Sequence, residues 1–206
     1  EANLLEAVKE EGFQIKSGAA FHREDKRCEF FFDEQYTEGW TWTWQVKRAE
    51  FDQILAQQTA INGVDIRFGS EVIAVTCSAT EQLVTYKNSS SQEQQIKGRF
   101  IIDASGYGRV LPRLFDLGQP SKFVPRGALF SHFLDQKRTK EASQNIFVHS
   151  FNNNSSWIWA IPFSDGTTSV GVVGEQDYIK EMASNDAKAF KEFIKAFPDL
   201  KPIIKK

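Results

Sequence analysis

The stretch of sequence that decides the fold is FIIDASGYGRVLPR, residues 100–113. Three apolar residues end at Asp103, small residues follow through Gly106, and Val110 and Leu111 then open a helical pattern. An apolar run, a turn of small residues and a helix are typical of a β-strand that leads into a helix. Such a junction can hold a nucleotide, because free backbone N–H groups and the positive end of the helix dipole face the ligand.

Gly106 and Gly108 form only part of a dinucleotide-binding fingerprint. The full pattern, Gly-x-Gly-x-x-Gly, has a third glycine three residues on, which lets the helix pack closely on the strand. Here that position is Leu111. The pair by itself therefore favours a structural turn, and a nucleotide hypothesis needs support from the rest of the chain.

The charge and cysteine content exclude several classes of protein. The 206 residues include 25 Lys and Arg against 27 Asp and Glu, a net charge of -2. This balance lacks the basic excess of nucleic-acid-binding proteins, and no apolar run approaches the roughly 20 residues of a membrane helix. We therefore expect neither nucleic acid nor membrane as a partner. Cys28 and Cys77 lie far apart without metal-ligand spacing, as expected of reduced thiols in a cytoplasmic protein.

The order of elements predicts a mixed α/β fold of the α+β kind, with two interleaved subdomains. Helices are expected at residues 1–11, 48–62 and 178–197. Strands are expected at residues 13–21 (with a bend at Ser17 and Gly18), 28–32, 39–47, 64–68, 71–77, 81–87, 94–98, 128–134, 146–151, 156–163 and 167–173. The segments before residue 118 include the one parallel element, and those after it are mostly antiparallel strands.

Few residues suggest chemistry on their own. The three histidines, His22, His132 and His149, have neither metal-ligand spacing nor a triad arrangement, so no metal site is expected. Lys16 interrupts an apolar segment. It is either an exposed strand lysine or a lysine that projects into a cavity, where it could donate hydrogen bonds or capture an electrophile.

Alternating aromatic residues mark the strand at residues 156–163. Trp157, Trp159 and Ile161 fall on one face of a strand that reaches Pro162. Such a face is either part of the hydrophobic core or one wall of a tunnel for a flat substrate.

Four stretches resemble segments of the flavin-dependent halogenases and of related FAD-dependent monooxygenases and reductases, the p-hydroxybenzoate hydroxylase-type flavoproteins. The most specific is WIWAIP, residues 157–162, which fits the halogenase signature Trp-x-Trp-x-Ile-Pro. GFQIKSGA (residues 12–19) is similar to the segment that presents the active-site lysine, and QVKRAEFD (residues 45–52) to the segment that opens the helix beside the flavin. DASG, residues 103–106, resembles the second FAD-contacting motif.

The resemblance implies part of a Rossmann-like FAD-binding subdomain interleaved with a mostly antiparallel substrate subdomain. Residues 1–45 and 118–206 would belong to the substrate subdomain, the latter with the antiparallel sheet and the C-terminal helix, and residues 46–117 to the FAD-binding domain. The family's glycine-rich pyrophosphate loop is not found in the sequence. Because the chain starts at Glu1 and its only methionine is Met182, we expect an internal fragment of a protein roughly twice as long.

The resemblance also implies an activity. In halogenases, reduced FAD and dioxygen oxidise a halide to hypohalous acid, which reaches a lysine. Lys16 matches that catalytic lysine and would hydrogen-bond the oxidant or form a haloamine. FAD contacts would come from Arg48, Asp103 and Gly106. The wall that keeps the substrate from the flavin would be formed by Trp157, Trp159, Ile161 and Pro162. The implied partners are a small organic substrate, a halide and a separate flavin reductase.

Two further hypotheses remain open. One is a flavin-dependent reductase acting on isoprenoid double bonds, like geranylgeranyl reductases, or a hydroxylase, in which Lys16 is incidental. The other is that the 206 residues alone are a folding unit without catalysis, since the pyrophosphate loop is absent from them. We expect these residues to retain FAD weakly or not at all.

Overall fold

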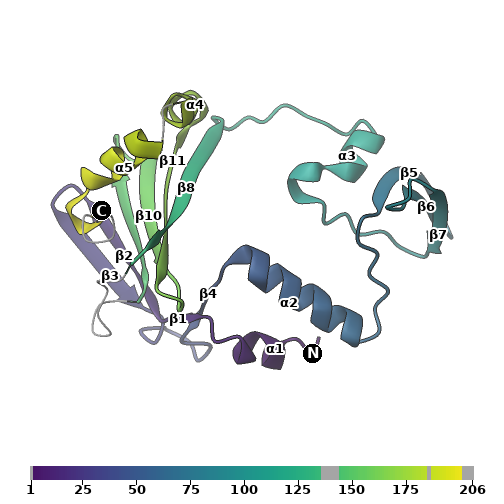
Figure 1. Cartoon of the computed structure of the whole chain (residues 1–206), viewed down its shortest axis with the longest axis horizontal. Helices are drawn as coiled ribbons and strands as arrows, with labels where there is room; N and C mark the ends of the chain where they lie inside the picture. The colour runs from purple at the N-terminus through teal and green to yellow at the C-terminus, as the bar shows by residue number, and fades with distance from the viewer. Residues whose placement is uncertain (1, 136–143, 185–186, 201–206) are drawn as a thin grey trace. The chain divides into compact units, whose positions relative to one another are not determined.

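The computed structural model describes residues 2–135, 144–184 and 187–200. Packing divides the chain into two compact units (Figure 1). The large unit consists of Glu1–Asn62 together with Phe123–Lys206, and the small unit is Gly63–Lys122. Since the last third of the chain returns to the unit that the first third begins, the small unit is an insertion within the large one.

The large unit is built on a six-stranded sheet with the strand order β3-β2-β9-β10-β11-β8. Neighbouring strands are antiparallel, except that β2 and β9 run parallel. The strands are β2 (Gly18–Arg23), β3 (Lys26–Phe31), β8 (Arg126–Leu134), β9 (Ile146–Phe151), β10 (Ser156–Pro162) and β11 (Thr167–Glu175). The hairpin between β10 and β11 turns at Gly166, whose φ of 80° favours glycine.

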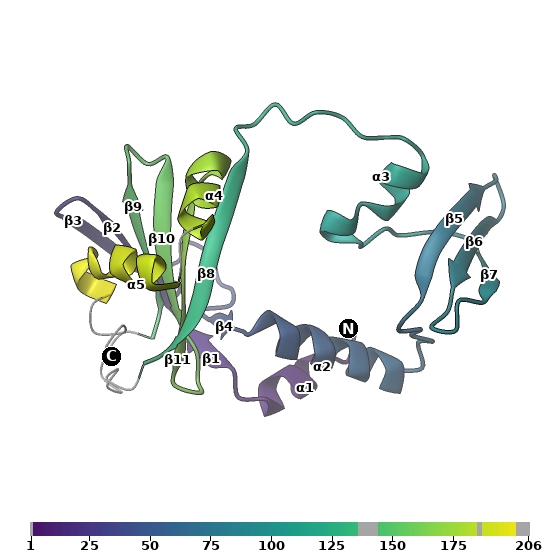
Figure 2. The same ribbon diagram turned by 45° about the horizontal axis from the view of Figure 1, so that its top comes forward.

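One face of this sheet carries the hydrophobic core. Helices α4 (Gln176–Ser184) and α5 (Ala187–Lys195) cover it, followed by the short helix η2 (Pro198–Leu200) (Figure 2). Ile158, Val170 and Val172 of the sheet are fully buried against Ile179 of α4 and Ile194 of α5. We call this side of the sheet the helix face.

The opposite side of the sheet carries the tryptophans. Along β10, burial alternates residue by residue, with Ile158 and Ala160 buried and Trp157, Trp159 and Ile161 half-buried. Because successive side chains of a strand point to opposite faces, the tryptophans lie on the side away from α4 and α5. We call this side the tryptophan face.

A two-stranded sheet lies at one end of the six-stranded sheet. It pairs β1 (Gln14–Lys16) antiparallel with β4 (Thr43–Gln45) (Figures 1 and 2). β4 leads into helix α2 (Arg48–Ile61), which packs against helix α1 (Leu5–Glu10).

The small unit is a three-stranded antiparallel meander of β5 (Glu71–Cys77), β6 (Gln82–Lys87) and β7 (Glu93–Gly98). It continues into the short helix η1 (Gly106–Gly108) and the five-residue helix α3 (Val110–Leu114), which packs against β5.

The predicted fold class is confirmed: the chain is mixed α/β with mostly antiparallel sheets. The first two predicted helices and the strands of the meander and of the larger sheet appear within a few residues of their expected bounds. Of the third predicted helix, residues 185–186 lie outside the described residues. The predicted domain boundaries, after residues 45 and 117, divide the chain by the ligand that each part would bind, FAD or substrate. They stay a prediction. Packing alone divides the chain after residues 62 and 122.

Three predicted strand segments are wrong. In the described structure, residues 64–68 form no strand, residues 39–42 only lead into β4, and residues 100–102 pair with no neighbour. Phe100 is 83% and Ile102 85% exposed. A strand needs a neighbouring strand to pair its N–H and C=O groups, and an apolar run alone does not supply one.

An ion pair holds the β10–β11 hairpin to the start of α2. The Lys47 ammonium binds the Asp165 carboxylate, which also accepts hydrogen bonds from the N–H and hydroxyl of Thr167, at 3.0 and 2.7 Å. Burial raises the pKa of Asp165, but the bonds from Lys47 and Thr167 and the Lys47 charge lower it by more, to about 2.

We expect Ile158→Ala to lower the free energy of unfolding by about 2–5 kcal/mol, because it leaves a cavity on the helix face. Ile161→Ala is the matched control: it removes the same atoms from the same strand but on the half-buried tryptophan face, and should cost clearly less. Denaturant unfolding of both variants measures the difference. Equal losses would show that the core is not confined to the helix face.

The Asp165 ion pair predicts a pH-dependent contribution to stability. The carboxyl has a lower pKa in the folded protein than the ordinary aspartate value of about 3.9, so its contribution is full above that value and disappears as the pH falls through about 2. Asp165→Asn should therefore be less stable than the wild type by a constant amount above about pH 5, and the gap should narrow below pH 4.

Denaturant unfolding at several pH values between 3 and 7 tests this dependence. Asp177→Asn is the control, because the Asp177 side chain is 98% exposed and should show almost no difference at any pH. A gap for Asp165→Asn that is unchanged at pH 3 would contradict the prediction.

Candidate functional site

Lys16 lies at the junction between the two sheets of the large unit. It is the last residue of β1, where it pairs with Thr43 of β4. Ser17 separates it from Gly18, the first residue of β2. The predicted bend at Ser17 and Gly18 is therefore confirmed, and it passes the chain from one sheet to the other.

The Lys16 side chain is half-buried beside an aromatic ring. Its Nζ atom lies 5.4 Å from the centroid of the Phe32 ring. None of the ion pairs among the described residues includes Lys16. Burial lowers the pKa of its ammonium group, because the charged form loses hydration. An amine in this setting is easier to deprotonate than an exposed lysine, and so is better suited to act as a nucleophile.

Asn145 fixes the backbone that follows Lys16. Its Oδ1 atom accepts hydrogen bonds from the N–H groups of Ser17 and Gly18, both at 2.9 Å. Asn145 is buried and stands 128 positions from Ser17 in the chain. Sequence reasoning missed it, because an isolated asparagine before a strand carries no periodic or motif signal.

A second buried amide, that of Gln45, links the two-stranded sheet of β1 and β4 to the end of β10. Gln45, in β4, donates from Nε2 to the carbonyl oxygens of Gln144, at 2.9 Å, and Pro162, at 2.6 Å. Pro162 ends the tryptophan strand, and Gln144 precedes Asn145. The two amides therefore join the segments around Lys16, residue 145 and the end of β10 into one hydrogen-bonded network.

The tryptophan face is an apolar surface with its indole rings held in place. Trp159 lies over Gly171, where a Cβ atom would collide with the indole, and its Nε1 donates to Ser169 Oγ at 3.2 Å. The Trp157 ring lies 5.4 Å from the Arg126 guanidinium carbon. Phe130, 60% exposed, packs beside Trp159 with ring centroids 6.2 Å apart.

The structure divides the four predicted wall residues between two faces. Trp157, Trp159 and Ile161 share the tryptophan face, whereas Pro162 is buried on the alternate side of β10. Pro162 instead contributes its carbonyl oxygen to the Gln45 link. Gly171 and Ser169, which set the place of the Trp159 ring, could not be chosen from the sequence without knowing the strand register.

Arg48 stands at the first position of α2 with an exposed side chain. Its Nε and Nη2 atoms bind the two carboxylate oxygens of Asp52, one helical turn on, at 3.1 and 3.0 Å. The hydrogen bonds and charge of Asp52 raise the pKa of Arg48, so the guanidinium stays charged. This fork holds one edge of the guanidinium and leaves the remaining N–H donors available to an anionic ligand.

Asp103 shapes the loop in which it lies. Its two carboxylate oxygens accept the N–H groups of Ser105 and Leu111, at 2.9 and 3.0 Å, while Ser105 Oγ accepts the N–H of Val110 at 2.9 Å. Hydrogen bonds from the side chain and backbone of Ser105 and from the Leu111 N–H lower the pKa of Asp103.

These bonds bear on the first interpretation of residues 100–113, whose contact with a nucleotide stays a prediction. The N–H groups of Val110 and Leu111, at the start of α3, are occupied by side chains of the same loop. Gly106 adopts a φ of 55° and so serves the turn, as the incomplete glycine pattern suggested. With only five residues, α3 also carries little helix dipole.

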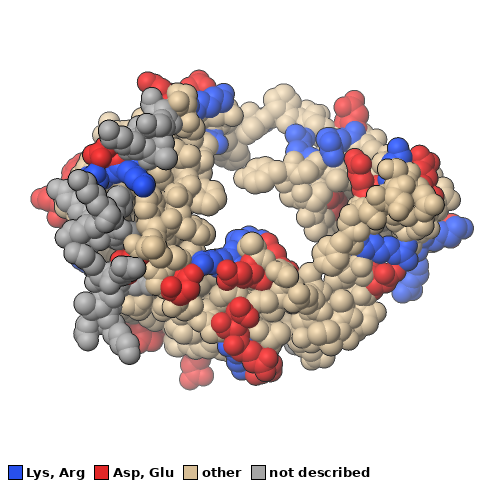
Figure 3. All heavy atoms as spheres, in the orientation of Figure 1, with Lys and Arg blue, Asp and Glu red and all other residues tan. Residues whose placement is uncertain are grey.

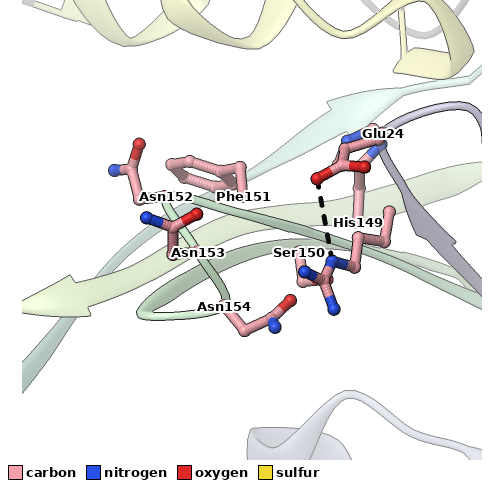
Figure 4. A pocket seen from close by; sticks show the side chains of 8 residues that line it. Glu24, His149, Ser150, Phe151, Asn152, Asn153 and Asn154 are labelled. Carbon is pink, nitrogen blue, oxygen red and sulfur yellow. Dashed lines mark ion pairs between the residues drawn. The ribbon is translucent and has the colours of Figure 1, made fainter.

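The described structure also contains a cavity remote from Lys16. A cavity of about 390 Å³ lies at the far end of β2 and β9 from Lys16 (Figure 4). It is lined by Arg23, Glu24, His149, Ser150, Phe151, Asn152, Asn153 and Asn154. Figure 3 shows acidic and basic side chains interspersed over the meander. None of the described helices is long and apolar enough to cross a membrane.

Comparison with known proteins places this arrangement among flavoproteins. Among solved structures, a flavoprotein/dehydrogenase from Cytophaga hutchinsonii is 40% identical, with a TM-score of 0.90 over 98% of this chain and 50% of the other. The myxobacterial chondrochloren halogenase, a variant of FAD-dependent halogenases, is 30% identical, with a TM-score of 0.81 over 98% of this chain and 47% of the other.

Curated relatives agree with the structures. The chain is 26% identical to the 1H-pyrrole-2-carbonyl-(peptidyl-carrier protein) chlorinase of Pseudomonas fluorescens, a match that covers 94% of this chain and 47% of the relative. It is 25% identical to the tryptophan 2-halogenase of Chondromyces crocatus, over 98% of this chain and 39% of the relative. The chain thus spans less than half the length of these curated relatives. The sequence profile of the tryptophan halogenases matches residues 7–202, and the chain therefore belongs to the tryptophan halogenase family.

Proposed function

We propose that this chain is the lysine-bearing part of an FAD-dependent oxidoreductase that halogenates a small organic substrate. The observation that carries the proposal is the setting of Lys16, a half-buried amine without a carboxylate partner among the described residues. The chlorinase and tryptophan 2-halogenase matched by the chain support this reaction class.

The residues present fit a flavin cofactor in part. Arg48 offers a charged, exposed guanidinium suited to an anionic group of FAD, and Asp103 and Gly106 give a loop a fixed shape against which a ligand could lie. When bound, reduced FAD together with dioxygen would supply the oxidising power for a halide. A separate reductase would deliver the reduced flavin, and the free thiols of Cys28 and Cys77 suit the cytoplasm.

Lys16 would act on the oxidised halide. Its neutral amine can accept a hydrogen bond from hypohalous acid, or attack the halogen to give a haloamine and water. The halogen would then pass to an electron-rich carbon of the substrate, the carbon would lose a proton, and the amine would be regenerated. The tryptophan face would present flat apolar surfaces against which such a substrate can lie.

A second candidate is a flavoprotein that transfers electrons or oxygen without a halide. The 40% identity to the Cytophaga hutchinsonii flavoprotein/dehydrogenase supports this candidate. In that case, the environment of Lys16 would serve another purpose, and the reaction would not depend on chloride or bromide.

Bromination of monochlorodimedone by the full-length protein tests the proposal. With reduced FAD, dioxygen and bromide, we expect bromide-dependent loss of the probe. A second assay uses a phenol as the substrate and adds methionine to scavenge free hypobromite. In it, Lys16→Ala and Lys16→Arg should each lower the rate of bromination by about a hundredfold or more, because neither side chain offers a neutral amine.

Two controls make this measurement decisive. Lys9→Ala removes an exposed lysine of the same unit and should leave the rate unchanged. Retained flavin absorbance in each variant shows that loss of product is not loss of cofactor. Oxidation of substrate without any dependence on bromide or chloride would favour the second candidate and overturn the halogenase proposal.

Arg48→Ala in the full-length protein should weaken FAD binding about tenfold or more, as expected for the loss of a charge-assisted hydrogen bond. Arg67→Ala is the matched control, because Arg67 is likewise an exposed arginine that pairs with an aspartate, Asp65. Fluorescence titration of FAD measures both. Equal affinities for the wild type and Arg48→Ala would exclude a contact between Arg48 and the cofactor.

A further inference from the structure

We propose that Asn145 is a positioning residue for Lys16, holding the lysine at the junction of the two sheets through the backbone that follows it. This proposal deepens the proposed function, because the reason for holding Lys16 in place rests on that function. The hydrogen-bond geometry on which it stands does not depend on any halide chemistry.

The first support is the bonding of the junction itself. Lys16 ends a three-residue strand whose one partner among the described strands is another three-residue strand. The Ser17 and Gly18 N–H groups then both bind Asn145 Oδ1 at 2.9 Å, and the Ser17 carbonyl accepts the N–H of Phe32 at 2.8 Å. One carbonyl oxygen has two lone pairs, so a single asparagine can satisfy both donors.

The second support is the close packing around Gly18. A Cβ atom at this position would collide with the backbone carbonyl oxygen of Phe30 and lie 3.1 Å from Asn145 Nδ2. Only glycine therefore lets β3 and the Asn145 side chain approach together. Phe32, whose backbone is bonded to Ser17, is also the residue whose ring lies beside Lys16 Nζ.

The third support is the anchoring of Asn145. It is 8% exposed, and the residue before it, Gln144, accepts a hydrogen bond from Gln45. Gln45 belongs to the strand that pairs with β1, and it also binds the carbonyl of Pro162. Asn145 is thus fixed relative to both sides of the lysine junction and to the end of the tryptophan strand.

A merely structural asparagine would stabilise the start of β2 without affecting the lysine amine. A positioning residue should in addition determine how deeply Lys16 is buried. Replacing Asn145 by leucine removes the acceptor at nearly constant size and leaves two N–H groups without their partner. The junction should then open, and Lys16 should become more hydrated.

Competitive labelling of lysines over a range of pH, read by mass spectrometry on the full-length protein, tests this expectation. In Asn145→Leu, we expect the pH midpoint for labelling of Lys16 to rise toward the ordinary lysine value. Hydrogen exchange at Ser17 and Gly18 should speed up about tenfold or more. Asn62→Leu, which alters an exposed asparagine of the same unit, should change neither.

A conservative variant keeps the test decisive if Asn145→Leu does not fold. Asn145→Asp retains an acceptor oxygen in place and should keep the Ser17 and Gly18 amides protected. Wild-type exchange at these two amides as fast as in the exposed Asn152–Asn154 turn would overturn the proposal. A folded Asn145→Leu variant with an unchanged Lys16 midpoint would do the same. Absence of halogenation would not, because neither readout uses a halide.

Discussion

The large unit depends on the burial of one face of its six-stranded sheet beneath α4 and α5. Ile158, Val170 and Val172 have no exposed surface there, and burial of such side chains contributes about 1.5–3 kcal/mol each. Because strand side chains alternate, the same packing that buries Ile158 sends Trp157 and Trp159 to the opposite side. The apolar surface proposed to bind the substrate is therefore a consequence of how the core packs. No separate interaction is needed to turn the tryptophans to that side.

The lysine junction depends on a different kind of interaction. β1 and β4 are three residues long, too short to hold a side chain in place through their own ladder. Two buried amides, Gln45 and Asn145, supply what the ladder lacks by bonding to backbone groups of three separate segments. Buried hydrogen bonds of this kind are costly to break, because each leaves a polar group without water or partner. The site is thus apolar where a substrate would lie and hydrogen-bonded where the lysine is held.

The sequence could predict features that repeat over short distances. The alternation in WIWAIP predicted which tryptophans share a face, and the break at Ser17 and Gly18 predicted the bend. The same alternation places Pro162 on the core side, away from the tryptophans. The sequence could not show that Asp103 bonds within its own loop, since those bonds depend on the geometry of neighbouring residues. The role of Asn145 could not be predicted, because its partners lie 127 and 128 residues away in the chain. They come together through the parallel pairing of β2 with β9. The strand predicted at residues 100–102 failed for a related reason: apolar character does not specify a partner.

The chemistry proposed for Lys16 requires that burial outweigh the forces that favour its charged form. The Phe32 ring, 5.4 Å from Nζ, attracts an ammonium by about 0.5–1 kcal/mol and so favours the charged form. A carboxylate at hydrogen-bonding distance would act in the same direction more strongly, and no described ion pair places one there. Burial of the amine acts in the opposite direction and lowers its pKa. An aromatic neighbour favours the protonated form less than an acidic one would, so a lysine can be held in a fixed position while its amine stays easier to deprotonate, as a reaction with an oxidised halogen requires.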